Sequence, residues 1–328
     1  MIILFLSVGY ALLNEKLSIN ATGVVGVPSG PKLNEVVLAN ELPTLNTGDG
    51  LYNYNSKYYF SGASVNNYVM YNDEVWRIVS IEEDGGIKIV KDTIVDQQTI
   101  ANLENETTFW TINTNNNTNT INNVKNQGRI IFDFKGRRPI DKNLENSYCD
   151  YTKNGCNAYD KGTIRDLTID EASLLKIYLE TVFFPNMTPL AKSQVQNYDL
   201  NIGIVETNKK INVVLTSEKT NTTNSFIGLL NISDYVYATQ DTTCRNSFDK
   251  EACATSNWLM LENYQFYIQN GKYVSGNAQV WTITSAGKIT SQDANNPFYL
   301  RPVVVLNKNI TATGSGTPTD MYILGAIS

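Results

Sequence analysis

The chain has 328 residues, of which 42% are hydrophobic and only 18% are charged, and it carries a net charge of −6. This length and apolar content suffice for one large β-rich domain or two smaller ones. The acidic balance argues against a nucleic-acid partner, and the lack of histidine excludes Ser–His–Asp and Cys–His catalysis as well as histidine metal ligation.

An apolar run at residues 1–11 has the length of the hydrophobic part of a signal peptide, with small residues placed for cleavage after Ala11. No Lys or Arg precedes this run, and a buried N-terminal strand or helix is the alternative interpretation. Residues 12–49 predict an N-terminal strand and a tether, with one short helix at residues 33–42. We expect an exported protein, either secreted or at the cell surface.

Residues 67–90 contain the clearest strand signal, two runs rich in Val, Ile, Tyr and Trp that are separated by Gly85 and Gly86. Glycine supplies the positive φ that tight turns need, so this stretch predicts a β-hairpin with Trp76 in the core. A later run at residues 299–306 predicts a buried strand of the same sheet.

Four cysteines form two closely spaced pairs, Cys149 with Cys156 and Cys244 with Cys253. Their spacing does not fit a zinc ribbon, and both pairs lie in polar, turn-like sequence. We therefore predict two local disulfides, each closing a short loop, with four free buried thiols as the alternative.

Helices are expected in the middle of the chain. A capping box at residues 168–171 is followed by apolar residues at helical spacing, and Pro185 ends that helix. Thr188 and Pro189 then predict a second helix that runs to about Asn197.

The second half of the chain predicts mostly strands. The runs NIGIV, INVVLT and FIGLL predict three strands from residue 201, and Ser233 is expected to begin a short helical turn. Further strands are predicted at residues 279–284, 288–290 and 321–324. The predicted fold class is α+β and β-rich, a mixed sheet with two or three short helices and long loops in one domain at residues 50–328.

Five blocks of this sequence resemble, in the same order, exported proteins of gut Gram-positive bacteria. The blocks are NNYVMYNDEVWRIVSIEEDGGIKIV, YLETVFFPNMTPLAKSQV, FIGLLNISDYVYAT, C-x₈-C-x₃-NWL and LRPVVVLNKNITATGSGTPTDMYIL. Those proteins carry an uncharacterised domain of the DUF6273 type, and the resemblance covers most of residues 50–324. It implies a C-type-lectin-like fold. The leader SVGYALLNEKLSINATG also resembles those of exported proteins, some of which assemble into fibres.

The calcium motifs of sugar-binding C-type lectins, Glu-Pro-Asn or Gln-Pro-Asp with Trp-Asn-Asp, are not in this sequence. The candidate binding residues are instead Asp293, Asn295 and Asn296, whose oxygen atoms lie on a loop braced by Pro297. A plain surface turn is the favoured interpretation. We therefore expect no cofactor, with Ca²⁺ as the alternative.

Three functions remain, and the favoured one is a non-enzymatic surface binding module, adhesin-like, for an extracellular glycan or protein ligand. The second is a subunit of an extracellular fibre or pilus, in which residues 12–27 donate a strand to another copy of the chain. The third is an enzyme that hydrolyses glycosides with a carboxylate pair chosen from Asp133, Asp150 and Asp160. No motif ties these carboxylates together, so we expect a protein that is not an enzyme.

Overall fold

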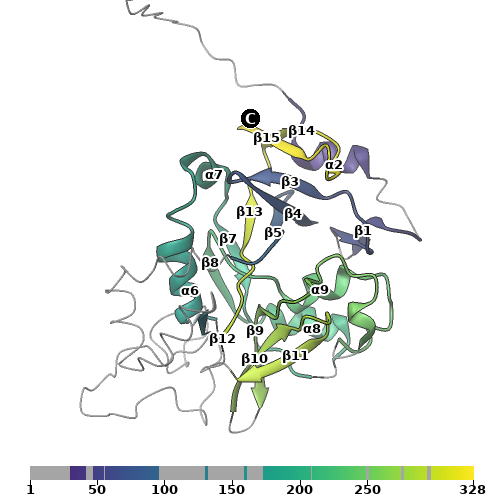
Figure 1. Ribbon diagram of the computed structural model, residues 1–328, viewed down its shortest axis with the longest axis vertical. Coiled ribbons are helices and arrows are strands. Elements are labelled where there is room, and N and C mark those ends of the chain that lie inside the picture. The colour runs from purple at the N-terminus through teal and green to yellow at the C-terminus, as the bar shows by residue number, and fades with distance from the viewer. Residues whose placement is uncertain are drawn as a thin grey trace, which may run out of the picture.

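The computed structural model describes ten stretches of the chain, and every structural statement below concerns these residues: 30–41, 47–54, 56–95, 130–131, 159–160, 173–207, 209–248, 251–274, 277–293 and 297–328. They form an α+β fold that is rich in strands, as predicted (Figure 1). Among the helices in these stretches, none is long and apolar enough to cross a membrane.

The largest sheet has eight strands, and its order is β1-β2-β4-β3-β15-β14, with β5 between β4 and β13. All neighbours are antiparallel except β3 and β15, which run parallel. The strands are β1 (Gly50–Tyr54), β2 (Lys57–Ser61), β3 (Tyr68–Tyr71), β4 (Glu74–Ile81), β5 (Ile87–Lys91), β13 (Val303–Leu306), β14 (Ile310–Thr313) and β15 (Tyr322–Ile327).

The predicted hairpin is confirmed as β4 and β5. Its turn closes through a hydrogen bond from the Glu82 amide to the Gly86 carbonyl oxygen at 2.8 Å, and Gly85 takes the expected positive φ of 88°. Trp76 is fully buried, as predicted. The late run also joins this sheet, because β13 pairs with β5 along its whole length.

Three smaller sheets complete the strands. The first contains β9 (Phe266–Val274), β10 (Asn277–Ile283) and β11 (Ile289–Asp293), and it confirms the strands predicted at residues 279–284 and 288–290. The others are the pairs β7 (Tyr198–Asn201) with β8 (Thr222–Ser225), and β6 (Ile130–Ile131) with β12 (Pro297–Phe298).

The described residues contain five α-helices, more than the two or three expected. They are α2 (Leu33–Asn40), α6 (Leu174–Tyr178), α7 (Pro189–Gln194), α8 (Ile211–Glu218) and α9 (Ile232–Tyr237); a π-helical turn (Leu179–Phe183) continues α6, and a 3₁₀ turn (Glu251–Ala254) follows α9. The predicted helices at residues 33–42 and 188–197 are therefore confirmed. Ser173 caps α6 by accepting from the Lys176 amide, whereas the predicted capping box at residues 168–171 lies outside the described residues.

The strand predicted from INVVLT is wrong, because these residues begin α8. Val214 and Glu218 are buried and lie four positions apart, while Val213 is 40% exposed, so the buried positions follow the period of a helix. β-branched residues favour strands in isolation, but burial of this one face decides the structure here.

The runs NIGIV and FIGLL are also not strands, since β7 and β8 lie just before them in the chain. Both runs are mostly buried, although Phe226 is 43% exposed, and only Asn201 belongs to a strand, as the last residue of β7. Their main-chain groups bond to distant strands. Gly228 exchanges two 2.9 Å hydrogen bonds with Val303, and the Val205 amide donates to the Gly271 carbonyl oxygen at 2.9 Å. Their apolar character predicted strands, and this prediction is wrong for every residue except Asn201.

Helices α8 and α9 lie between the β1 end of the large sheet and the β9–β11 sheet (Figure 1). α9 contacts β2 of the large sheet and β9 of the smaller one, and α8 packs against α9. This junction of helices and sheets positions the candidate site.

Candidate functional site

Five ionisable side chains gather where the large sheet meets α8 and α9. They are Lys57, Glu82, Lys88, Glu218 and Asp234, here called the buried charge cluster. Lys88 Nζ lies 3.1 and 3.2 Å from the two carboxylate oxygens of Asp234, and 3.9 Å from Glu82 Oε1. Lys57 pairs with the other oxygen of Glu82. Apart from Lys57, each member is buried.

Regular structure holds both members of the central ion pair. Lys88 belongs to β5, which is buried along its whole length and pairs with β4 on one edge and β13 on the other. Asp234 lies in the first turn of α9, where Oδ2 accepts from the Asn231 amide at 2.9 Å and so satisfies a free amide at the start of the helix.

Lys88 and Glu82 each stabilise the charged form of the other. Burial disfavours the charged form of Glu82, but Lys88 and Lys57 outweigh it and lower the pKa of Glu82 to about 2. Burial likewise opposes the charge on Lys88, yet Asp234 and Glu82 raise the pKa of Lys88 above its ordinary value. Glu82 and Lys88 are therefore charged at neutral pH.

Glu218, the last residue of α8, behaves differently. Burial raises the pKa of Glu218 to about 7, although the Ser233 amide at 2.9 Å and the Ser233 hydroxyl at 2.6 Å donate to its oxygens and favour the charged form. Glu218 is therefore increasingly uncharged as the pH falls below about 7.

Two spaces lie beside the cluster. A small cavity of about 40 Å³ is lined by Lys88, Asp234 and Glu218, among others. An open groove of about 470 Å³, here called the polar groove, shares part of its wall with this cavity. The residues that line the polar groove are Lys57, Glu83, Asp84, Gln196, Asn197, Tyr198, Asp199, Asn201, Lys219 and Asn224.

Tyr198 connects the polar groove to the cluster, because it lines the groove and its hydroxyl donates to Glu82 Oε2 at 2.7 Å. Burial raises the pKa of Tyr198 above its ordinary value, and the neighbouring charge of Glu82 raises it further. The phenol thus remains a neutral hydrogen-bond donor.

Stacked tyrosines line the other side of the small cavity. The rings of Tyr54 and Tyr237 are 4.6 Å apart with an interplanar angle of 19°, and Tyr59 lies 4.8 Å from Tyr237. The guanidinium of Arg245 lies over the Tyr54 ring, 4.4 Å from its centre. This arrangement presents flat aromatic surface beside polar groups.

Of the predicted binding residues, only Asp293 is described, and it is not part of this site. Asp293 ends β11, is exposed, and does not line the polar groove; Asn295 and Asn296 lie outside the described residues. In the described part of the chain no three His, Cys, Asp or Glu residues are grouped to hold a metal ion. Of the proposed catalytic carboxylates, Asp160 accepts from Thr223 and lies 3.4 Å from Lys176 Nζ, whereas Asp133 and Asp150 lie outside these residues.

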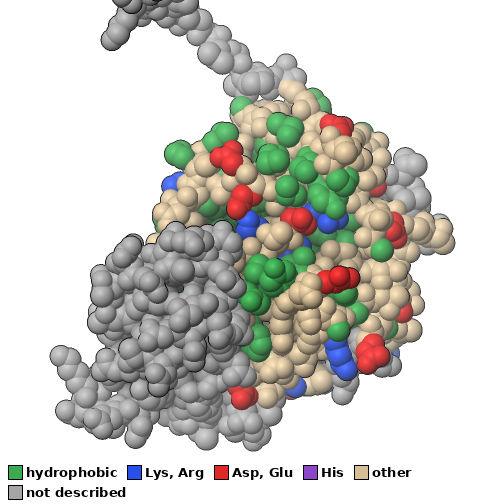
Figure 2. All heavy atoms as spheres, viewed as in Figure 1, with side chains coloured by type: hydrophobic (Ala, Val, Ile, Leu, Met, Phe, Trp, Pro, Cys, Tyr) green, Lys and Arg blue, Asp and Glu red, His purple; other side chains and the backbone are tan. Residues whose placement is uncertain are grey.

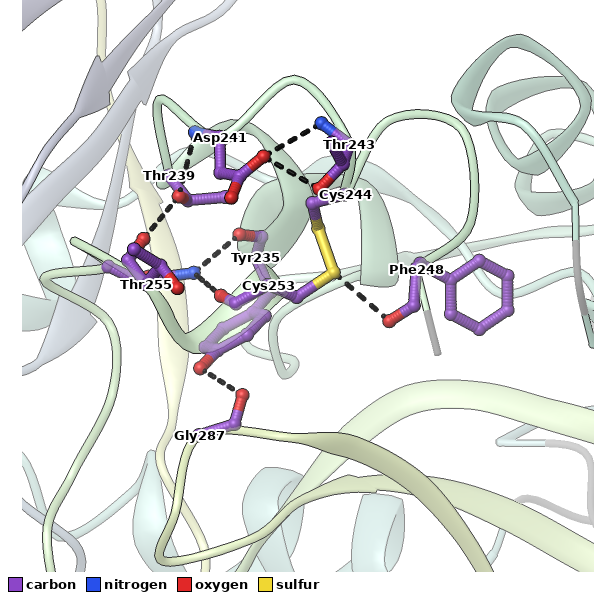
Figure 3. The surroundings of a disulfide bond; sticks show 10 residues. Tyr235, Thr239, Asp241, Thr243, Cys244, Phe248, Cys253, Thr255 and Gly287 are labelled. Atoms are coloured by element: carbon purple, nitrogen blue, oxygen red, sulfur yellow. Dashed lines mark hydrogen bonds between the residues drawn. A yellow bond between two sulfur atoms is a disulfide. The ribbon is translucent and has the colours of Figure 1, made fainter. Parts of the chain in front are cut away.

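The disulfide between Cys244 and Cys253 is confirmed, with an S–S distance of 2.01 Å (Figure 3). The loop around it is held by side-chain hydrogen bonds, among them those from the Thr243 amide and hydroxyl to Asp241. The other predicted pair, Cys149 and Cys156, lies outside the described residues.

Sequence reasoning missed the buried charge cluster. Lys88 alternates with isoleucines in IKIVK, and such a lysine is normally expected to face water. Its partners Asp234 and Glu218 come from helices far along the chain, one of which was predicted as a strand. Comparisons with protein-family models, with curated proteins and with solved structures found no match.

Proposed function

We propose that this protein is an exported, non-enzymatic module of the cell surface whose polar groove binds an extracellular ligand, with a glycan as the favoured class and a protein as the alternative. The observation that carries this proposal is the groove of about 470 Å³, whose lining residues all carry an amide, carboxylate, amine or phenol group. Such groups donate to and accept from the hydroxyls of a sugar.

The groove also has the rigidity that tight binding requires. Lys57 and Tyr198 both line it, and both are fixed by the buried carboxylate of Glu82. Side chains held in this way lose little conformational entropy when a ligand binds. Asn224 and Asp199, on the paired strands β7 and β8, are likewise joined by a 2.9 Å hydrogen bond.

Two features of the chain support export from the cell. The apolar run at residues 1–11 is typical of an export signal. The disulfide between Cys244 and Cys253 fits an oxidising compartment. The five sequence blocks support a C-type-lectin-like arrangement, in which loops carried on a rigid sheet recognise the ligand.

A glycan array probed with the purified full chain tests this proposal, followed by calorimetric titration of any glycan that is retained. The double variant Lys219→Ala with Asn224→Ala removes two groove side chains, and we expect it to weaken binding at least about tenfold. The matched control is Asn212→Ala, because Asn212 is an exposed residue of α8 that lies outside the groove. Equal affinity of the double variant and the control would rule out the groove as the binding site.

We propose, as the second candidate, a fibre subunit in which residues 12–27 of one copy pair with a sheet edge of the next. The supporting observation is that the chain before α2 runs along the edge strand β14. Lys32 pairs with Thr311, and the Ala312 amide donates to the Pro31 carbonyl oxygen at 3.1 Å. Residues 12–27 come shortly before Pro31 and Lys32 in the sequence, and β14 is an edge strand that pairs with these two residues.

The neighbouring strands also expose apolar side chains. Met70 of β3 and Ile323 of β15 are paired and are 37% and 53% exposed, and Figure 2 shows hydrophobic side chains gathered at the end of the molecule where these strands lie. Negative-stain electron microscopy of the full chain, beside a variant that begins at Gly30, tests strand donation. Filaments from the full chain alone support it, and separate particles from both proteins contradict it.

A further inference from the structure

We propose that Lys88 and Asp234 condense to form an isopeptide bond, a covalent amide that joins β5 to α9. Lys88 Nζ lies 3.1 and 3.2 Å from the two carboxylate oxygens of Asp234, and the residues are 146 positions apart in sequence. This covalent site is independent of the ligand proposed for the groove.

The fold holds both reactants in place. The side chains of Lys88 and Asp234 are 8% and 1% exposed. β5 lies between two strands of the large sheet, and α9 is anchored by the side-chain amide of Asn257, which donates to the Tyr235 carbonyl oxygen at 2.9 Å. Two separate molecules lose translational and rotational entropy when they condense. Here folding has already brought the two groups together, so the reaction does not bear that cost again.

Burial favours the amide over the ion pair. An ammonium and a carboxylate removed from water carry a large desolvation cost, whereas a hydrogen-bonded amide does not. Condensation removes one positive and one negative charge, and the ion pair between Lys57 and Glu82 remains balanced beside the new bond. In water the same reaction is unfavourable, so the interior supplies the driving force.

The reaction needs no other reactant. A proton passes from Lys88 Nζ to Asp234 along their hydrogen bond, and the neutral amine attacks the Asp234 carboxyl carbon, which forms the C–N bond of a tetrahedral intermediate. Glu82, whose Oε1 lies 3.9 Å from Nζ, accepts a second proton from nitrogen and passes it to the departing hydroxyl. The C–O bond breaks, and ammonium plus carboxylate become amide plus water.

The small cavity gives the product water a place to go. Its volume of about 40 Å³ exceeds what one water molecule needs, and Lys88 and Asp234 are among its walls. The cavity also shares wall residues with the open polar groove, so the two spaces are neighbours.

Intact mass spectrometry of the folded full chain, after reduction of its disulfides and sequencing of its N-terminus, tests the proposal. We expect a mass lower than calculated by one water molecule, and a protease digest in which one branched peptide contains both Lys88 and Asp234. A folded protein of full calculated mass would overturn the proposal, as would a water loss that maps to other residues.

Variants test the chemistry. Lys88→Arg keeps a positive charge but has no amine that forms this amide, so it should show the full mass. Asp234→Asn should still form the bond with loss of one ammonia molecule instead of water, which no salt bridge can imitate. Glu82→Gln should slow bond formation in newly synthesised chain at least about tenfold, because the proton carrier is lost. The control is Lys308→Arg, because Lys308 is exposed, and it should react as the unaltered protein does. A Glu82→Gln protein that reacts equally fast would exclude the proton transfer through Glu82.

Discussion

Arg301, which is 1% exposed, donates from Nη1 to the carbonyl oxygen of Leu259 at a distance of 2.6 Å. Its Nε and Nη2 atoms donate to the carbonyl oxygens of Lys91 and Asp92 at 2.9 and 3.1 Å. One buried guanidinium thus joins the segment before β13 to the end of β5 and to the loop after the disulfide. Burial lowers the pKa of Arg301 to about 9.

Replacement of Arg301 by Met should lower the free energy of unfolding by about 3 kcal/mol, because three buried carbonyl oxygens lose their donor. Urea unfolding followed by tryptophan fluorescence measures this change. The control is Lys308→Met, since Lys308 is exposed, and it should change the free energy of unfolding by less than about 0.5 kcal/mol. Equal stability of the two variants would contradict the anchoring role.

Glu218 should make the protein less stable as the pH rises toward neutral. Its pKa is raised from 4.5 to about 7 in the folded state, so the folded protein binds a proton that the unfolded chain releases. The resulting stabilisation is fully present below pH 4.5 and is lost as the pH rises through about 7, and it is on the order of 3 kcal/mol. Urea unfolding at a series of pH values in this range gives the slope of the free energy of unfolding against pH.

Glu218→Gln replaces the protonated carboxyl by a neutral amide, so the slope attributed to Glu218 should disappear in this variant. Glu262 is exposed, and Glu262→Gln should keep the slope of the unaltered protein. If Glu218→Gln retained that slope, another group would have to titrate in its place.

The disulfide between Cys244 and Cys253 should contribute about 2.5 kcal/mol to the free energy of unfolding, because it closes a short loop in the unfolded chain. The double variant Cys244→Ser with Cys253→Ser should show this loss in urea unfolding. Treatment of the double variant with a dithiol reductant should not lower its free energy of unfolding further through this loop. An unchanged midpoint in the double variant would mean that the side-chain hydrogen bonds around Asp241 hold the loop without the disulfide.

Tyr198→Phe should lower the free energy of unfolding by about 2 kcal/mol, since it removes a hydrogen bond to the buried charge of Glu82. The comparison is Tyr264→Phe, because Tyr264 is 37% exposed. Thermal unfolding of both variants measures how much each substitution lowers the free energy of unfolding. A negligible effect of Tyr198→Phe would indicate that Lys57 and Ser80 alone satisfy the Glu82 carboxylate.

The sequence predicted correctly those helices and strands whose structure depends on interactions between residues close in the chain. The β4–β5 hairpin needs a glycine turn and β-branched strands, and both are visible in residues 67–90. The N-terminus of α7 is equally local, because Thr188 Oγ1 accepts from the Ala191 amide and Pro189 stands at the first helical position. The late run was also predicted, from its hydrophobicity, to join the sheet of this hairpin; the structure adds that it pairs with β5 as β13.

The candidate site could not be predicted in the same way. Lys88 and Asp234 are partners only because α9 packs against the large sheet, and no local pattern encodes a contact across 146 positions. α8 was taken for a strand, since β-branched residues dominate INVVLT, and this hid the position of Glu218 at a helix end. Burial of a charge depends on what covers it, which a single sequence does not state.

The position of β15 determines when this domain folds during synthesis. β15 lies between β3 and β14, and β13 lies beside β5, so the large sheet cannot be completed until the ribosome has translated residue 327. Until then β3 and β5 each have a free edge in the nascent chain, because β15 and β13, which pair with them, come later in the sequence.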